Sequence, residues 1–143
     1  RVLVDYGHNA GSFEAIIATA KHLKPVQLAG VIGSPGDRRE QDIVTLGAIA
    51  GRGFQRLFIK EDEDLRGRKP GETASLLLTG ALGAGLKRDK IDVILKEDEA
   101  VLKALEAATP GDLVVVFYEN YEKVMKTLLD IRKVMRVSEA KTI

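Results

Sequence analysis

The sequence predicts an α/β fold, namely a Rossmann-like three-layer α/β/α arrangement around a mainly parallel sheet of five or six strands. Strand-like and helix-like segments alternate five times along the 143 residues, which is typical of a parallel sheet with helices on both faces. Two strand-like segments, 26–33 and 113–118, are dense in apolar residues, as strands buried on both faces are. The length suits one domain with a sizeable core, so we expect residues 1–143 to form a single domain.

Five short apolar segments bounded by turn residues are expected to be strands: 1–5, 26–33, 54–60, 91–95 and 113–118. Five segments with apolar residues near the 3.6-residue period are expected to be helices: 12–23, 38–51, 70–83, 98–108 and a last helix from 121. The apolar stripes of the last three helices should face the sheet, and they include Leu82, Leu102, Leu105, Tyr121 and Leu129. The basic end from Arg136 is expected to be a frayed tail or a short edge strand.

The helix boundaries follow from capping and turn residues. Ser12 can cap the first helix, and Pro25 prevents that helix from continuing. Asp37 to Glu40 has capping-box spacing, with Asp in place of Ser or Thr. Pro70 suits the first turn of the third helix, and two glycines, Gly83 and Gly85, are expected to end it.

Composition excludes several functional classes. The net charge of +1 gives no bulk electrostatic attraction for nucleic acid or membrane surfaces. With no cysteine and only His8 and His22, the chain has no thiolate metal site, and we expect no metal site of its own. No apolar run approaches the roughly 20 residues that span a bilayer, and no signal peptide is visible. The sequence therefore predicts a cytoplasmic protein that binds neither nucleic acid nor membrane.

The most informative stretch is Asp-Tyr-Gly-His-Asn at residues 5–9, where the first strand ends and the first helix begins. Ligands of open α/β sheets bind at the carboxyl ends of the strands. Asp5 can accept hydrogen bonds from ribose hydroxyls, while His8 and Asn9 can donate hydrogen bonds to phosphate oxygens near a helix N-terminus. The alternative is a polar loop that only caps the helix, since Asp, Asn and Gly are common turn residues.

Three later segments follow other strands and should share the same edge. Asp37, Arg38 and Arg39 begin a helix, where paired arginines are unfavourable for the helix dipole unless an anion binds. Residues 61–69 form a long charged loop that begins with Glu61, Asp62, Glu63 and Asp64, and such loops are often functional. Glu119 and Asn120 follow the last strand. Solvated capping turns and loops are the alternative interpretation of all three segments.

Several motifs are absent. The sequence has no Gly-x-x-x-x-Gly-Lys-Ser/Thr loop, no Gly-x-Gly-x-x-Gly after the first strand, and no serine elbow or cysteine nucleophile. We therefore expect the domain to hold part of a ligand and to carry no complete set of catalytic residues. The chain opens directly inside a strand, so we also expect it to be an excised domain whose N-terminal neighbour is missing.

The motifs resemble a known family. Residues 4–10 resemble the Asp-Tyr-Ala-His-Asn-Pro signature that opens the C-terminal domain of Mur ligases and folylpolyglutamate synthetases, and residues 31–38 resemble its second signature. Residues 60–72 and 110–119 resemble the cyanophycin synthetase branch. Two departures are Gly7 in place of Ala and Ala10 in place of Pro, which leaves the first loop less rigid.

The resemblance implies a C-terminal domain of a larger ligase that uses ATP and Mg²⁺ to form an amide bond through an acyl phosphate. It implies upstream P-loop and ATP-grasp domains, a Mg²⁺ ion held mainly by the central domain, and a homo-oligomeric full enzyme. Arginine would be the incoming amino acid and a poly-aspartate (cyanophycin) chain the acceptor of that arginine. By their positions in the family motifs, the residues that would face the nucleotide are Asp5, His8 and Asn9. The residues that would line the active-site cleft are Asp37 and Arg38.

An arginine substrate needs carboxylates that can receive its guanidinium. The candidates are Asp37, Glu61, Asp62 and Asp64. Three alternatives remain: a Mur-type ligase for peptidoglycan precursors or folate, a non-catalytic interaction domain, and a receiver domain of two-component signalling. The receiver domain fits poorly because the last strand ends in Phe-Tyr-Glu without lysine.

Overall fold

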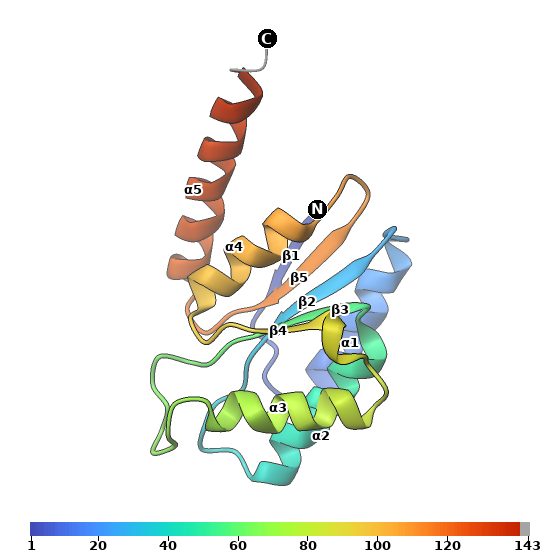
Figure 1. The fold of residues 1–143 in the computed structure, drawn as a ribbon, viewed down its shortest axis with the longest axis vertical. Helices are drawn as coiled ribbons and strands as arrows, with labels where there is room; N and C mark the ends of the chain where they lie inside the picture. The colour runs from blue at the N-terminus through green and yellow to red at the C-terminus, as the bar shows by residue number, and fades with distance from the viewer. Residues whose placement is uncertain (141–143) are drawn as a thin grey trace.

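The computed structural model describes residues 1–140, with side-chain surroundings through residue 134. These residues form five parallel strands, which are β1 (Val2–Asp5), β2 (Leu28–Ile32), β3 (Arg56–Ile59), β4 (Ile91–Val93) and β5 (Leu113–Phe117). The strand order is β1-β5-β2-β3-β4 (Figure 1). The predicted α/β class is confirmed, with a five-stranded sheet that is parallel throughout the described residues.

Five helices alternate with the strands, as predicted: α1 (Ala10–His22), α2 (Glu40–Gly53), α3 (Glu72–Gly83), α4 (Glu97–Ala107) and α5 (Tyr121–Ala140). A 3₁₀ turn, Arg88–Lys90, precedes β4. Figure 1 shows α1, α2 and α3 on one side of the sheet and α4 and α5 on the other, with the C-terminal part of α5 extending past the sheet. The three layers are therefore those of the prediction.

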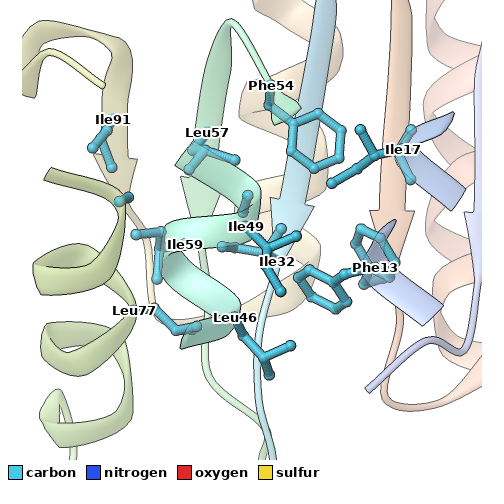
Figure 2. Packing of buried hydrophobic residues seen from close by; sticks show 14 of the residues in the cluster. Phe13, Ile17, Ile32, Leu46, Ile49, Phe54, Leu57, Ile59, Leu77 and Ile91 are labelled. Carbon is cyan, nitrogen blue, oxygen red and sulfur yellow. The ribbon is translucent and has the colours of Figure 1, made fainter. Parts of the chain in front are cut away.

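The sheet separates two apolar cores. The larger core joins Phe13 of α1, Leu46 of α2 and Leu77 of α3 to Ile32 and Leu57 of the sheet (Figure 2). The smaller core packs residues of α4 and α5 on the opposite face. Both central strands, β2 and β5, are buried along their whole length, as expected for apolar strands covered on both faces.

Helices α2 and α3 approach each other through glycines. A Cβ atom on Gly47 would lie 2.1 Å from the carbonyl oxygen of Leu77, and one on Gly80 would lie 2.0 Å from that of Val44. The two backbones are therefore too close for any side chain at these positions. This close contact holds α3 beside α2 and so fixes where the loop between β3 and α3 ends.

The helix starts differ from the prediction. Asn9, and not Ser12, is the N-cap of α1, and Ser12 completes a reciprocal capping box from the third helical position. Asp37 does not cap α2, because the helix begins only at Glu40 and its N-cap, Arg39, makes no side-chain capping bond. The Asp37 carboxylate is paired with the Arg66 side chain instead.

Helix α3 begins at Glu72, after Gly71, whose φ of 86° lies in the left-handed region that favours glycine. Pro70 therefore precedes the helix and does not lie in its first turn. The predicted end is confirmed, since α3 stops at Gly83 and Gly85 follows with a positive φ.

Four side chains predicted to face the sheet are exposed: Leu82, Leu102, Tyr121 and Leu129. Helix α4 turns Ala100, Val101 and Ala104 inward, and Leu105, as predicted, packs partly buried against the smaller core. The predicted tail or edge strand from residue 136 is also wrong for 136–140, which continue α5. Residues 141–143 lie outside the described residues.

A buried carboxylate at the opposite, amino edge of the sheet predicts acid sensitivity. Asp112 accepts hydrogen bonds from the backbone N–H and hydroxyl of Thr109 and from the N–H of Gln27. The N–H of Thr109, followed by these other contacts, outweighs burial and holds the pKa of Asp112 below its ordinary value. Its stabilisation is complete above the unfolded-state pKa of about 4 and is lost as pH falls through the lower folded-state pKa.

We therefore expect the melting temperature to fall on acidification below about pH 4, and Asp112→Asn to reduce that dependence. Thermal unfolding monitored by circular dichroism from neutral to acidic pH measures both effects. Asp89→Asn, at an exposed position in the 3₁₀ turn, is the control. Equal pH slopes for Asp112→Asn and the unmodified chain would contradict the assignment.

Candidate functional site

Four loops meet at the carboxyl edge of the sheet. They follow β1, β2, β3 and β5, the four adjacent strands of the order β1-β5-β2-β3. A cleft of about 280 Å³ lies between them. It is lined by side chains and backbone of all four loops: Tyr6, Gly7, His8, Gly33, Pro35, Lys60, Asp62, Glu63, Arg66, Phe117, Tyr118, Glu119, Asn120 and Lys123. Ligands of parallel α/β sheets bind at this edge, so the cleft is the candidate site.

The residues of the opening motif, 5–9, have two roles: some line the cleft, and others hold the loop after β1 in its conformation. His8 lines the cleft, and its Nδ1 lies 3.2 Å from the carbonyl oxygen of Tyr6. Asp5 accepts a 2.7 Å hydrogen bond from the N–H of Gly7, and Asn9 accepts a 3.0 Å hydrogen bond from the N–H of Ser12 as the cap of α1. Asp5 and Asn9 therefore fix the backbone of the loop that presents Gly7 and His8.

The residues after β2 lie at the periphery. Asp37 pairs with Arg66 at 2.9 Å, and this hydrogen bond is the main cause that keeps the pKa of Asp37 below its ordinary value. Arg39 forms two hydrogen bonds to Asp42 of its own helix. The carbonyl oxygen of Arg38 accepts from Arg68. None of Asp37, Arg38 and Arg39 lines the cleft.

The acidic loop after β3 contains four carboxylates, and the three that were predicted to receive arginine have different partners. Glu61 is buried, and its two oxygens accept from the N–H groups of Gly71 and Ala74 at 2.9 and 3.0 Å. Asp62 lines the cleft and pairs with Lys60 at 3.0 Å. Asp64 accepts from the N–H of Arg66. Glu61 therefore satisfies the start of α3, and of the predicted carboxylates only Asp62 lines this cleft.

Sequence reasoning missed Lys60 as a site residue. Its side chain is 1% exposed, and its ammonium lies 3.0 Å from Asp62 and 2.8 Å from Glu97. Burial alone lowers the pKa of Lys60, but the two carboxylates outweigh it, so the pKa is raised and the lysine is charged. The available signal was a lysine directly after the buried end of the strand Arg56–Ile59 and before four consecutive acidic residues.

Aromatic side chains line one wall of the cleft. Tyr6 lies with its ring centroid 5.2 Å from that of His8 and 5.6 Å from that of Tyr118, and Tyr118 lies 5.6 Å from Tyr121. Tyr6 and Tyr121 are more than half exposed. The rings are tilted or edge-on to one another, and their exposed faces can receive a flat ligand group or a cation. This row was also missed, because its members come from loops far apart in the sequence.

A second cleft of about 480 Å³ lies on the other side of the acidic loop. It shares a wall with the first cleft, made of Asp62, Glu63, Glu119, Asn120 and Lys123. The N–H of Glu63 donates to Glu119 at 2.8 Å, and Lys123 pairs with the Glu63 carboxylate. The acidic loop is therefore held against the start of α5 and separates two clefts of different lining.

The site offers hydrogen-bonding and charged groups, and it contains no nucleophile held by a base. Among the side chains that the structure describes, through residue 134, no three His, Asp or Glu converge as a metal site. None of the described helices combines the length and apolar character that crossing a membrane requires. The geometry thus suits one side of a polar ligand site.

Comparison with known proteins gives concordant matches. The family model for the Mur ligase, glutamate ligase domain, matches residues 1–117. The chain is 43% identical over 126 residues to the cyanophycin synthetase of Crocosphaera subtropica and 32% identical over 122 residues to the UDP-N-acetylmuramyl-tripeptide synthetase of a Roseiflexus species. These alignments cover 88% and 85% of this chain but only 14% and 24% of the relatives.

The fold has a matching solved structure. A UDP-N-acetylmuramoyl-L-alanyl-D-glutamate–2,6-diaminopimelate ligase superposes with a TM-score of 0.66 at 23% identity, covering 80% of this chain and 23% of that one. At this identity the match supports the fold alone. By the family model and the cyanophycin synthetase identity together, the chain belongs to the Mur ligase family, as its C-terminal glutamate ligase domain.

Proposed function

We propose that this domain is part of a cyanophycin synthetase, an ATP-dependent ligase that adds arginine to the side-chain carboxylates of a poly-aspartate chain. The observation that carries the proposal is the cleft at the carboxyl edge, where His8 of the opening motif and Asp62 of the acidic loop line one cavity. The 43% identity to a cyanophycin synthetase favours this branch of the family.

The proposed reaction joins a carboxylate and an amine. The carboxylate attacks the γ-phosphorus of ATP, giving an acyl phosphate and ADP; the arginine amine then attacks the acyl carbon, and phosphate leaves as the amide forms. ATP supplies the leaving group, and Mg²⁺ offsets charge on its phosphates. Upstream P-loop and ATP-grasp domains of the same polypeptide complete the site, so the isolated domain is inactive in this proposal.

The nucleotide side is assigned to the opening motif. His8 faces the cleft and can donate to a phosphate oxygen, while Asp5 and Asn9 hold the loop in the conformation that exposes the backbone beside it. A carbon on Gly7 would lie 3.0 Å from the Asp5 carboxylate and 3.1 Å from Phe117. The absent side chain therefore lets the loop pack tightly against Asp5 and Phe117.

The arginine side is assigned to the acidic loop, with Asp62 as the first candidate. Asp62 is in the cleft with Glu63 and Glu119 nearby, whereas both oxygens of Glu61 are used by α3. Asp37, Arg38, Arg39 and Asp64 stay in the proposal as groups that hold the outer edge of the cleft. The exposed ring of Tyr6 adds a face on which a guanidinium can stack.

The full-length polypeptide that carries this domain tests the proposal. Purified enzyme is incubated with ATP, Mg²⁺, a poly-aspartate primer and one amino acid at a time, and ADP release and incorporation are measured. We expect arginine-dependent ADP release that requires the primer. Activity only with a peptidoglycan precursor or with folate would favour another Mur-type ligase and overturn the assignment.

Two substitutions test the acceptor side. Because Asp62 lines the cleft and Asp37 is peripheral, Asp62→Asn should raise the KM for arginine about tenfold or more, as expected for loss of a charged contact, whereas Asp37→Asn should change it by less than about threefold. Steady-state kinetics with varied arginine at saturating ATP measures this. An unchanged KM in both variants would remove these residues from the arginine site.

A further inference from the structure

One buried cation, Lys60, helps to hold the acidic loop on the body of the domain. The Lys60 ammonium lies between Asp62, on the loop, and Glu97, the first residue of α4. An ammonium has three donors in a compact head, and here it makes ion pairs to the loop after β3 and to the start of α4, which follows β4. Losing it would leave two mostly buried carboxylates facing each other without a cation.

The path of Lys60 depends on the neighbouring strand. A Cβ atom on Gly33, just after β2, would lie 2.7 Å from Cε of Lys60 and 3.1 Å from Nζ. Gly33 therefore leaves the space through which the lysine stem runs, from the end of β3 across the end of β2. Lys60 is also part of the cleft wall, so this space and the cleft adjoin.

The contacts continue from Glu97 back to the loop. The same Glu97 oxygen that pairs with Lys60 accepts from the N–H of Glu119 at 3.0 Å. Glu119 in turn accepts from the N–H of Glu63. Lys60, Glu97, Glu119 and the segment 62–63 thus form a closed ring of hydrogen bonds and covalent chain, and that ring contributes to the wall shared by the two clefts.

We propose that Lys60 is a positioning residue: through Asp62 and Glu97 it fixes the loop 61–63 and so sets the arginine side of the cleft. The proposal rests on the function proposed above and deepens it, since it assigns a role to a side chain with almost no exposed surface of its own. Nucleotide contacts come from the loop after β1, so the effect of Lys60 should fall on the amino acid and not on ATP.

The test uses Lys60→Met in the full-length polypeptide, because methionine keeps an unbranched stem and removes the charge. We expect the KM for arginine to rise about tenfold or more while the KM for ATP changes less than about twofold. Hydrogen exchange should become faster at the N–H of Glu63, which donates to Glu119 in the ring. This second measurement reports loop order and does not depend on activity.

Arg56→Met is the matched control. Arg56 begins the same strand, pairs with Asp92 at 3.0 Å and lines neither of the two clefts at the carboxyl edge. It should leave both KM values and the Glu63 exchange rate unchanged. The double variant Lys60→Met/Glu97→Gln removes one unpaired charge, so it should regain thermal stability relative to Lys60→Met but keep the raised KM for arginine.

The possible outcomes distinguish a positioning role of Lys60 from a purely structural one. Equal changes in both KM values, or a raised arginine KM that returns to normal when stability is regained, would mean that Lys60 only stabilises the fold and would overturn the proposal. Unchanged Glu63 exchange in Lys60→Met would overturn it as well. If the unmodified enzyme forms no arginine amide at all, the proposed function fails, and that result is obtained before any variant is compared.

Discussion

Gly80→Ala should lower the stability of the domain by about 2–3 kcal/mol, even though alanine is the better helix former. Within a helix, alanine is favoured over glycine by about 1 kcal/mol. Here the new methyl would lie 2.0 Å from the carbonyl oxygen of Val44 and 2.8 Å from the backbone N of Ala48. Backbone atoms cannot rotate away, so α3 must move off α2 and lose packing along the larger core.

Urea unfolding of the 143-residue chain measures the effect, together with a melting temperature that should fall by about 8 °C. Gly83→Ala is the matched control in the same helix, because no atom lies within 4 Å of the added carbon. It should be neutral or slightly stabilising. A Gly80→Ala protein as stable as Gly83→Ala would show that the two helices are not in close contact through this glycine.

Glu61→Ala is expected to have the second large effect, about 3 kcal/mol of lost stability. Its buried carboxylate receives the N–H groups of Gly71 and Ala74 at the start of α3, and bonds to a charged acceptor are worth about 1.5–3 kcal/mol each before the cost of burying the charge. Removing it leaves these donors without that acceptor where the helix begins. The stability of Glu61→Gln should lie between that of the unmodified chain and that of Glu61→Ala, because the glutamine amide retains one acceptor oxygen.

Glu63→Ala, two residues away with a largely exposed side chain, should change stability by less than about 0.5 kcal/mol. Chemical unfolding of the three variants under one set of conditions gives the comparison. The result also decides between two roles for Glu61, because the sequence had suggested that it binds arginine. Unchanged stability combined with a raised arginine KM in Glu61→Ala would return it to the binding site.

The fold was predictable because its signals are local. Apolar β2 and β5, the helical periods and the breaks at Pro25 and Gly83 can each be recognised in the sequence, and the structure has all five predicted strands and helices. One error lies where two elements could each use the same residue. Asp37 has the spacing of a cap but pairs with Arg66, which lies in another loop.

The candidate site was only partly predictable, for the same reason. Placing loops at the carboxyl edge requires only the alternation of strands and helices, and His8 and Asp62 do line the cleft there. Several charged side chains of the site have hydrogen-bond or ion-pair partners in other elements. The sequence therefore could not show that Glu61 accepts hydrogen bonds at the start of α3 or that Lys60 pairs with Glu97. A carboxylate in a charged loop has the same appearance in the sequence whether it binds a substrate or a helix.

The order of the strands also determines when the domain can take shape on the ribosome. The first strand to be synthesised pairs with the last, Val2 opposite Val114, and β5 lies between β1 and β2. Strands β2, β3 and β4 can associate early, but β2 keeps an apolar edge open until β5 emerges. Translation of a single late strand thus closes that edge and brings residues 5–9 to the cleft, so a nascent chain that stops before β5 has neither a complete sheet nor the four-loop cleft.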